Sequence, residues 1–194
     1  MQTESSSTPK PISGWMTFCH IRRDLERYSE QAGCESLLLL AIKNLHRHPS
    51  LAGVLFYRVG RWLWTGRRNP VLFLMLVCYY LVYPLVRMYS GVELSPRADV
   101  GPGLCIMHFG PTVIHPDVSA GENLTVLHGV TIGASRTGVP RIGSGVSIGV
   151  GATILGGIVV GNCVCIGAGA VVTQDLPDNC TAVGMPARPL EACD

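Results

Sequence analysis

The chain has 194 residues, of which 47% are hydrophobic and 14% charged, and its formal net charge at pH 7 is +2. This composition supplies a substantial core for one large or two small domains and excludes disorder over most of the chain. The sequence has no long basic run of the kind that phosphate backbones require, so nucleic acid is not expected as a partner. A small basic group at Arg61, Arg67 and Arg68 would still suit an anion.

The first residues carry no sign of a folded segment or of a signal peptide. Residues 1–12 contain a run of Ser, Thr and Pro without apolar periodicity, so residues 1–16 are expected to form a flexible N-terminus. No apolar segment follows the start closely enough for a signal peptide, so secretion is not indicated and a cytoplasmic location is expected.

Residues 17–90 are predicted to form a helical domain of three or four helices. Apolar residues recur there at helical spacing in three stretches, Phe18–Leu25, Leu37–Leu45 and Leu51–Leu63. His48-Pro49-Ser50 supplies a break and an N-cap before the third stretch.

The uncharged stretch from Asn69 to Val86 is compatible with three structures. Its 17 residues from Pro70 would span about 25 Å as a helix, short of the roughly 30 Å hydrocarbon core of a bilayer. Tyr79, Tyr80, Tyr83 and Pro84 also interrupt the apolar run. We therefore expect a helix that packs within the protein or forms an oligomer contact, and we leave open an interfacial helix at the inner face of the membrane and a membrane span.

A period of six residues governs the second half of the chain. An α-helix would repeat its apolar residues every three or four positions and a strand every two, so this period predicts a coil of short strands whose inward residues stack. We predict a β-helix over residues 91–183, followed by an extended tail over residues 184–194. The thirteen aliphatic anchors are Leu94, Val100, Ile106, Ile114, Ala120, Val126, Ile132, Ile142, Ile148, Ile154, Val160, Ile166 and Val172.

Two interruptions of the period mark expected binding segments. The step that follows Ile106 is eight residues and the step that follows Ile132 is ten. We therefore expect a bulged coil after His108 and a protruding loop from Ala134 to Arg141, because insertions in a solenoid collect where it binds.

Eight cysteines are present, and none forms a C-x-x-C pair. Several lie in apolar runs, so buried reduced thiols are expected in place of disulfides, as at Cys78, Cys105, Cys163 and Cys165. The pair Cys163 and Cys165 has no nearby His partner, so no metal site is expected.

Five motifs of the sequence match one known family: Tyr57–Trp64 in the helical part, then Gly103–His108, Val126–Gly133, Ile166–Val172 and Val183–Arg188. Through them the sequence resembles the serine acetyltransferase branch of the hexapeptide-repeat acyltransferases over roughly residues 17–190. This resemblance implies an α+β protein, with an N-terminal helical segment followed by a left-handed parallel β-helix (a hexapeptide-repeat solenoid). It also implies a homotrimer around the helix axis, with a hexamer left open, and acetyl-CoA lying between neighbouring subunits.

The resemblance also implies an active site. The family's His at the position of His108 is the general base that takes the proton from the acceptor hydroxyl as it attacks the thioester, and an imidazole suits this task because it titrates near neutral pH. Glu93 is the candidate for the carboxylate that fixes the imidazole tautomer, although the family has Asp there. His115 and His128 fall where the branch varies and are expected to line or pack the site.

For acetyl-CoA, the resemblance implies contacts made mainly by the backbone along the coils. Gly133, Ala134, Val150 and Ala168 are the expected contacts, with Arg188 near the CoA phosphates or adenine. Small residues there would admit the pantetheine arm, and the turn chemistry of a solenoid would favour them as well.

Three departures from the family's pattern concern the acceptor. Gly138 and Val139 replace the Arg-His pair that holds the serine carboxylate, Met107 replaces the Asp before the catalytic His, and Arg27-Tyr28-Ser29 stands for Arg-Asp-Pro. Losing several such contacts, at about 1.5–3 kcal/mol each, would weaken serine recognition by orders of magnitude. Restoring charge with Gly138→Arg and Val139→His is expected to raise serine turnover.

The sequence therefore favours an acetyl-CoA-dependent O-acetyltransferase that acts on a sugar or another small-molecule hydroxyl. A serine O-acetyltransferase of cysteine biosynthesis is the first alternative. A non-catalytic β-helix scaffold is the second, and a shift in melting temperature on adding CoA would distinguish the scaffold from both enzymes.

Overall fold

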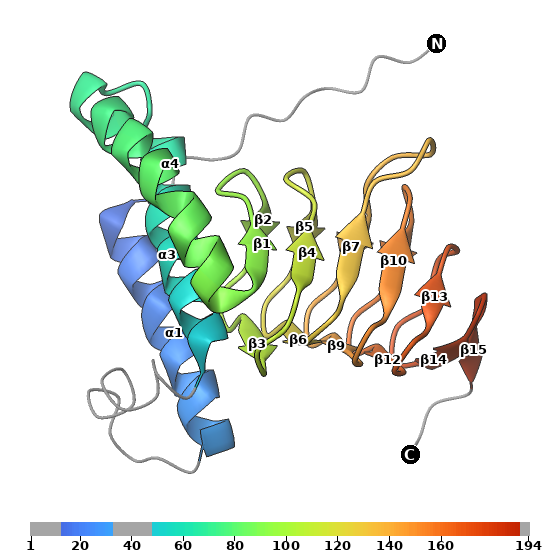
Figure 1. Ribbon diagram of the computed structural model, residues 1–194. Coiled ribbons are helices and arrows are strands. Elements are labelled where there is room, and N and C mark those ends of the chain that lie inside the picture. Colours follow the sequence, from blue (N-terminus) through green and yellow to red (C-terminus); the bar gives the residue numbers. More distant parts are fainter. Residues whose placement is uncertain (1–12, 33–47, 191–194) are drawn as a thin grey trace.

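The computed structural model describes residues 13–32 and 48–190. Within these residues, three helices gather at one end of a solenoid of short strands (Figure 1), namely α1 (Gly14–Ala32), α3 (Pro49–Thr65) and α4 (Pro70–Ser90). α1 begins ahead of the boundary at residue 17 that the sequence suggests. The apolar stretch Leu37–Leu45 lies outside the described residues.

The solenoid is built from three sheets, and each coil contributes one short strand to each of them in turn. The first sheet contains β1 (Val92–Leu94), β4 (Thr112–Ile114), β7 (Thr131–Gly133), β10 (Thr153–Leu155) and β13 (Val171–Val172). The second contains β2 (Asp99–Val100), β5 (Ser119–Ala120), β8 (Arg141–Ile142) and β11 (Val159–Val160). The third contains β3 (Cys105–Met107), β6 (Thr125–Leu127), β9 (Ser147–Ile148), β12 (Cys165–Ile166), β14 (Thr181–Gly184) and β15 (Ala187–Leu190).

Nearly all strand pairs are parallel, as stacking of successive coils requires. The exception is the antiparallel pair β14–β15, in which Gly184 lies opposite Ala187. The segment that the sequence suggests as an extended tail therefore folds back as a hairpin on the last coil.

The thirteen anchors point into the solenoid. Each is 5% exposed or less except Ala120, which is partly buried and packs against the same core. A second inward residue stands two positions before most anchors, for example Leu104 before Ile106 and Val130 before Ile132. Each six-residue repeat thus forms one strand and one turn, and two of its side chains point inward.

The glycines that follow the anchors are required by close stacking of the coils. A Cβ built on Gly101 would lie 2.8 Å from the backbone of Gly121, and one on Gly143 would lie 2.6 Å from the Gly161 carbonyl oxygen. Any larger residue would push neighbouring coils apart at this corner.

The helices close the open edge of the first coil. Strands at the end of a solenoid leave backbone N–H and C=O groups without partners, which costs free energy when they are buried. Tyr57 of α3 donates its hydroxyl to the Ala98 carbonyl at 2.9 Å and accepts from the Val100 amide at 3.2 Å. Arg58 donates to the carbonyls of Val100 and Gly101 at 2.6 and 2.7 Å.

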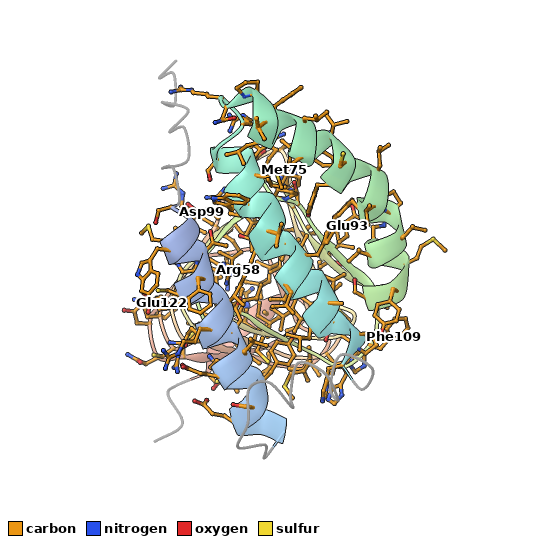
Figure 2. The ribbon with its side chains drawn as sticks, turned by 90° about the vertical axis from the view of Figure 1, so that its left-hand side faces the viewer. Arg58, Met75, Glu93, Asp99, Phe109 and Glu122 are labelled. Carbon is orange, nitrogen blue, oxygen red and sulfur yellow. The ribbon has the colours of Figure 1, made fainter. Side chains whose placement is uncertain are left out.

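α1 continues the same edge through Asp24. One carboxylate oxygen of Asp24 accepts from the amides of Gly103 and Leu104, each at 2.8 Å, and the other forms a buried ion pair with Arg58 at 2.7 Å. Burial raises the pKa of the Asp24 carboxyl, and Arg58 and the two amides oppose that shift. Figure 2 shows Arg58 between α1 and α3.

Ile106, the last capped residue of this edge, takes its partners from two helices. Tyr28 of α1 donates to the Ile106 carbonyl at 2.8 Å and accepts from its amide at 3.0 Å. Ser50 of α3 donates to the same carbonyl at 2.6 Å. The N-cap lies within His48-Pro49-Ser50, as the sequence suggests. His48 occupies it without a side-chain hydrogen bond, and Ser50 is used for docking.

α4 differs from the sequence expectation in its length. It continues through Pro84 to Ser90, and its 21 residues make it long and apolar enough to cross a membrane, although the sequence suggested that it would be too short. Tyr79 stacks on Phe56 of α3 at a centroid distance of 4.2 Å, so part of the helix packs as expected. Most of its apolar surface is nevertheless exposed.

Most cysteines within the described residues are exposed, and Cys19, Cys78, Cys163, Cys165 and Cys180 are free thiols. Cys105 and Cys180 are buried, and burial raises the pKa of the Cys105 thiol to about 12. Cys78, Cys163 and Cys165 are exposed, so the prediction of burial is wrong for them, because each stands on an outward position of its element.

Candidate active site

His108 stands at the corner where the chain passes from β3 to β4, and its side chain is exposed. Its backbone has φ of 65°, in the left-handed region that few residues other than Gly adopt and that His adopts more often than most. The turn from residue 108 to residue 111 is longer than the equivalent turn from residue 128 to residue 130, so the bulged coil that the sequence predicts is present.

The same corner of successive coils brings together several of the expected site residues. Met107 pairs with Leu127 across β3 and β6, which places His128 next to His108 in the stack. Gly151 donates to the His128 carbonyl at 3.0 Å and Gly169 to the Val150 carbonyl at 2.8 Å, so the stack continues through Val150 and Ala168. We call His108, His128, Val150 and Ala168 the catalytic column.

His128 contributes more to this corner than the sequence suggested. Its ring meets that of His108 edge to face at a centroid distance of 5.8 Å. Its Nδ1 is buried and has no hydrogen-bond partner among the described residues. The signal was present in the sequence, because the anchors Ile106 and Val126 are 20 residues apart and the two histidines share that spacing.

Glu93 lies on the outward side of β1 and is engaged elsewhere. Its carboxylate forms an ion pair with Arg87 of α4 at 3.0 Å, and both side chains are about half exposed. Within residues 13–32 and 48–190, no hydrogen bond or ion pair joins Glu93 to His108. The assignment of Glu93 as the orienting carboxylate therefore stays a prediction that requires the Arg87 contact to open.

The expected CoA contacts fall at two different corners. Val150 and Ala168 belong to the catalytic column, whereas Gly133 ends β7 and Ala134 follows it, at the corner between the first and second sheets. His115 follows β4 at that second corner, and its Nδ1 accepts from the Asp117 amide at 3.2 Å.

Arg188 lies at the C-terminal end of the solenoid. Its guanidinium donates to Gln174 Oε1 at 2.9 Å, and Gln174 follows β13 at the same corner as Gly133 and Ala134. Within one chain, Arg188 thus lies on the side of Gly133 and Ala134.

The protruding loop that the sequence predicts is present between β7 and β8, and it extends beyond the coils in Figure 1. Ser135 and Gly138 bridge its base, and Thr137 accepts from the Gly157 amide at 3.0 Å. Val139, at the family's His position, is partly buried against the core, and Gly138 has φ of 127°. A His at 139 would replace a packing residue and an Arg at 138 would be strained, so the double variant is not expected to restore a serine site.

The other two departures from the family's pattern are used by the helical cap. Met107 packs against a cluster that contains Tyr28 and Leu51. Arg27 donates to Thr125 Oγ1 at 2.7 Å, and Tyr28 is bonded to Ile106 as described above. These side chains hold α1 on the solenoid. Tyr28 is buried and Met107 and Arg27 are partly buried in these contacts, which leaves them little freedom to bind an acceptor.

The described residues contain no group of three or more His, Cys, Asp or Glu side chains suited to a metal ion. A Cβ built at Gly151 or Gly169 would meet no heavy atom within 4 Å, so the backbone beside Val150 and Ala168 is open. The site thus consists of an exposed histidine at one end of a column of stacked corner residues on a β-helix, with open backbone beside Val150 and Ala168.

This combination of a capped β-helix and a corner histidine defines a class of solenoid acyltransferases, and comparison with known proteins specifies it further. No protein-family model matches the chain. The serine acetyltransferase of Synechococcus elongatus is 36% identical over 145 residues, which cover 73% of this chain and 57% of that protein. The putative colanic acid biosynthesis acetyltransferase WcaB of Escherichia coli K12 is 39% identical over 140 residues, covering 70% of this chain and 86% of that protein.

Solved structures agree with these relatives. Serine acetyltransferase from Neisseria gonorrhoeae, in complex with serine, superposes with a TM-score of 0.75 and 31% identity over 90% of this chain and 69% of that one. A serine acetyltransferase in complex with CoA gives a TM-score of 0.77 and 25% identity over 91% of this chain and 71% of that one. The chain belongs to the serine acetyltransferase-like branch of the hexapeptide-repeat acyltransferases.

The predicted fold class, an N-terminal helical segment followed by a left-handed parallel β-helix, is confirmed by this membership. The chain spans about half the length of the curated serine acetyltransferases that it matches, from 34% to 57% in the cases compared, whereas it spans most of WcaB.

Proposed function

We propose that the chain is an acetyl-CoA-dependent O-acetyltransferase whose general base is His108. The observation that carries the proposal is the catalytic column. The exposed His108 stands at one end of it beside His128, and the backbone next to Val150 and Ala168 is open. Acetyl-CoA would supply the activated acetyl group as a thioester. The open backbone beside Val150 and Ala168 would accommodate its narrow pantetheine arm.

In this proposal His108 first takes up a proton and then returns it. The acceptor hydroxyl gives its proton to the imidazole, and the hydroxyl oxygen forms a bond to the thioester carbonyl carbon. The C–S bond then breaks, and the imidazolium returns the proton to the departing CoA sulfur. The exposed position of His108 lets an acceptor approach it from solvent.

The direct test replaces the base. We expect His108→Ala to lower kcat about 10²- to 10⁴-fold while CoA binding and folding persist, because the side chain is exposed and packs no core residue. His48→Ala, which removes a histidine at the start of α3, should retain activity. If His108→Ala keeps more than about a tenth of the wild-type kcat, the base assignment is wrong.

For the acceptor, we infer a hydroxyl on a saccharide or another small molecule other than serine. The support is that Met107 and Val139 serve packing where the family's pattern has charged residues, and that WcaB, a putative colanic acid acetyltransferase, is matched over 86% of its length. A screen of hydroxyl acceptors should give kcat/KM for L-serine at least about 10²-fold below that of the true acceptor.

Serine acetylation is the second candidate, and the similarity to the serine-bound Neisseria enzyme favours it. A kcat/KM for free serine near 10⁵ M⁻¹s⁻¹, about the ordinary range for enzymes on their own substrates, would establish it in place of the saccharide. A scaffold without catalysis would show no stabilisation by CoA, whereas an enzyme with CoA at 100 times its Kd gains about 2.7 kcal/mol.

We also propose that the chain works as a homotrimer. The two corners that hold the expected CoA contacts lie at opposite ends of the strands of the first sheet, so the contacts of one chain alone do not converge. A neighbouring copy would bring the Gly133 and Ala134 corner to the catalytic column. Sedimentation equilibrium should give the mass of three chains, or of six if trimers pair.

A further inference from the structure

We propose that the exposed face of α4 docks on an anionic lipid bilayer. This face consists of apolar residues that are each more than two-fifths exposed: Val71, Phe73, Leu74, Met75, Val77, Tyr80, Leu81, Val82, Leu85, Met88 and Tyr89. Soluble proteins rarely leave so continuous an apolar surface in water, and such surfaces mark contacts with proteins or membranes.

The charges around α4 favour a bilayer as the occupant. No acidic residue occurs between Pro70 and Ser90. Arg67 and Arg68 precede the helix, and Arg67 lies over the Trp64 ring at 4.2 Å. Arg87 stands in the last turn, where Glu93 pairs with its charge at 3.0 Å, so Arg67 and Arg68 at the other end of the helix supply the positive charge for lipid headgroups. Basic and aromatic residues beside an apolar helix suit the headgroup region, where each Lys or Arg gains from anionic lipids.

The packing of α4 favours a helix that lies on the membrane over one that crosses it. Tyr79 stacks on Phe56 of α3 and also contacts Tyr83, and the Cβ of a residue in place of Gly60 would collide with its ring. Only Gly91 lies between the end of α4 and the start of β1. It caps the helix in a left-handed conformation, and its N–H donates to the Arg87 carbonyl. Crossing a bilayer would strip α4 from α3 and draw the first strand after it.

A groove beside the exposed face offers room for lipid chains. It lies between α3 and α4, has a volume of about 490 Å³ and is lined by aliphatic and aromatic residues, including Leu55, Val59 and Leu85. Beyond the C-terminal end of α4, Figure 2 shows Phe109, which is 60% exposed and adjoins His108. An exposed aromatic side chain therefore stands at the corner that holds the candidate base, but the docking itself does not depend on acetyl transfer.

The test measures flotation of the full-length protein with vesicles of phosphatidylcholine and about one quarter phosphatidylglycerol, compared with phosphatidylcholine alone. The variant Leu81→Glu/Met88→Glu changes two side chains that are 74% and 77% exposed, so its melting temperature should stay close to that of the wild type. The matched control, Met185→Glu/Leu190→Glu, adds the same charge at the far end of the solenoid (Figure 1).

We expect the wild type and the control to float with the anionic vesicles, and the α4 variant to lose at least about tenfold in bound fraction. High salt or removal of phosphatidylglycerol should weaken binding of the wild type. A wild type that stays in the soluble fraction, or an α4 variant that floats as well as the wild type, would overturn the proposal. So would a larger assembly in solution that the α4 variant abolishes without any flotation, since that result assigns the face to a second copy of the chain.

Discussion

At the scale of single residues, His128 is the clearest case of a side chain that contacts the candidate base, although the sequence suggested only a lining or packing role. We expect His128→Ala to lower kcat about 10- to 100-fold, because the His108 ring loses the edge contact that limits its orientation. The pH–rate profile should shift as well, which a purely structural effect would not produce. A profile and kcat equal to those of the wild type would show that the contact is incidental.

Asp24 and Arg58 allow a comparison between a buried and an exposed ion pair. Asp24→Ala leaves the Arg58 guanidinium without its ion-pair partner in the core and two backbone amides without an acceptor, so we expect a loss of about 3–5 kcal/mol in the free energy of unfolding. Asp117→Ala breaks the half-exposed pair with Arg97 and should cost less than about 1 kcal/mol. Denaturant unfolding of both variants measures the difference, and equal losses would refute the special role of the buried pair.

At the scale of elements, the contact between α3 and α4 depends on one glycine. A Cβ on Gly60 would lie 2.6 Å from Cε2 of Tyr79, so Gly60→Ala must displace the ring or the helix. Overpacking of this kind costs about 1–3 kcal/mol, more than the gain in helix propensity of up to about 1 kcal/mol.

The control for this variant is Gly14→Ala, where the nearest heavy atom to a Cβ is 3.8 Å away. Thermal unfolding followed by tyrosine fluorescence should show a lower melting temperature for Gly60→Ala and none of that loss for Gly14→Ala. A stabilised Gly60→Ala variant would mean that α4 shifts at no cost.

The elements of the solenoid could be predicted from sequence because their signal is local. Each anchor repeats the conditions of the one before it, so Ile148 or Ile166 could be assigned from spacing alone. The helical cap could not, since nothing within the sequence around Asp24 specifies that its carboxylate meets the amides of Gly103 and Leu104. Such contacts depend on how helices dock, and periodicity carries no information about docking.

The candidate site shows the same division. His108 was assigned as the base from the resemblance to the family, and its place after an anchor, at a break in the period, is visible in the sequence as well. The partner of Glu93 was missed, because its ion pair with Arg87 depends on the end of α4 lying beside β1.

At the scale of the whole molecule, the cap changes what the β-helix can do alone. The anchors from Leu94 onward suggested an independent core, but removing residues 1–90 would expose the backbone groups that Tyr57, Arg58, Asp24 and Tyr28 now satisfy. We expect residues 91–194 expressed alone to aggregate, since an unpaired strand edge is a template for other chains.

Sedimentation and circular dichroism of this fragment, beside the full-length chain, measure the effect. A fragment that stays folded and forms a discrete trimer would contradict the expectation and show that the coils are self-sufficient.

The two ends of the solenoid together have a consequence for polymerisation. A stack of identical coils is in principle open to growth, because the last coil of one molecule presents the edge that the first coil of another requires. Here side chains occupy one end, where a foreign strand would need backbone groups. At the other end β15 runs antiparallel and contains Pro189, which has no N–H to offer. The coil count is thereby fixed in each molecule, and head-to-tail fibres are disfavoured at the level of single hydrogen bonds.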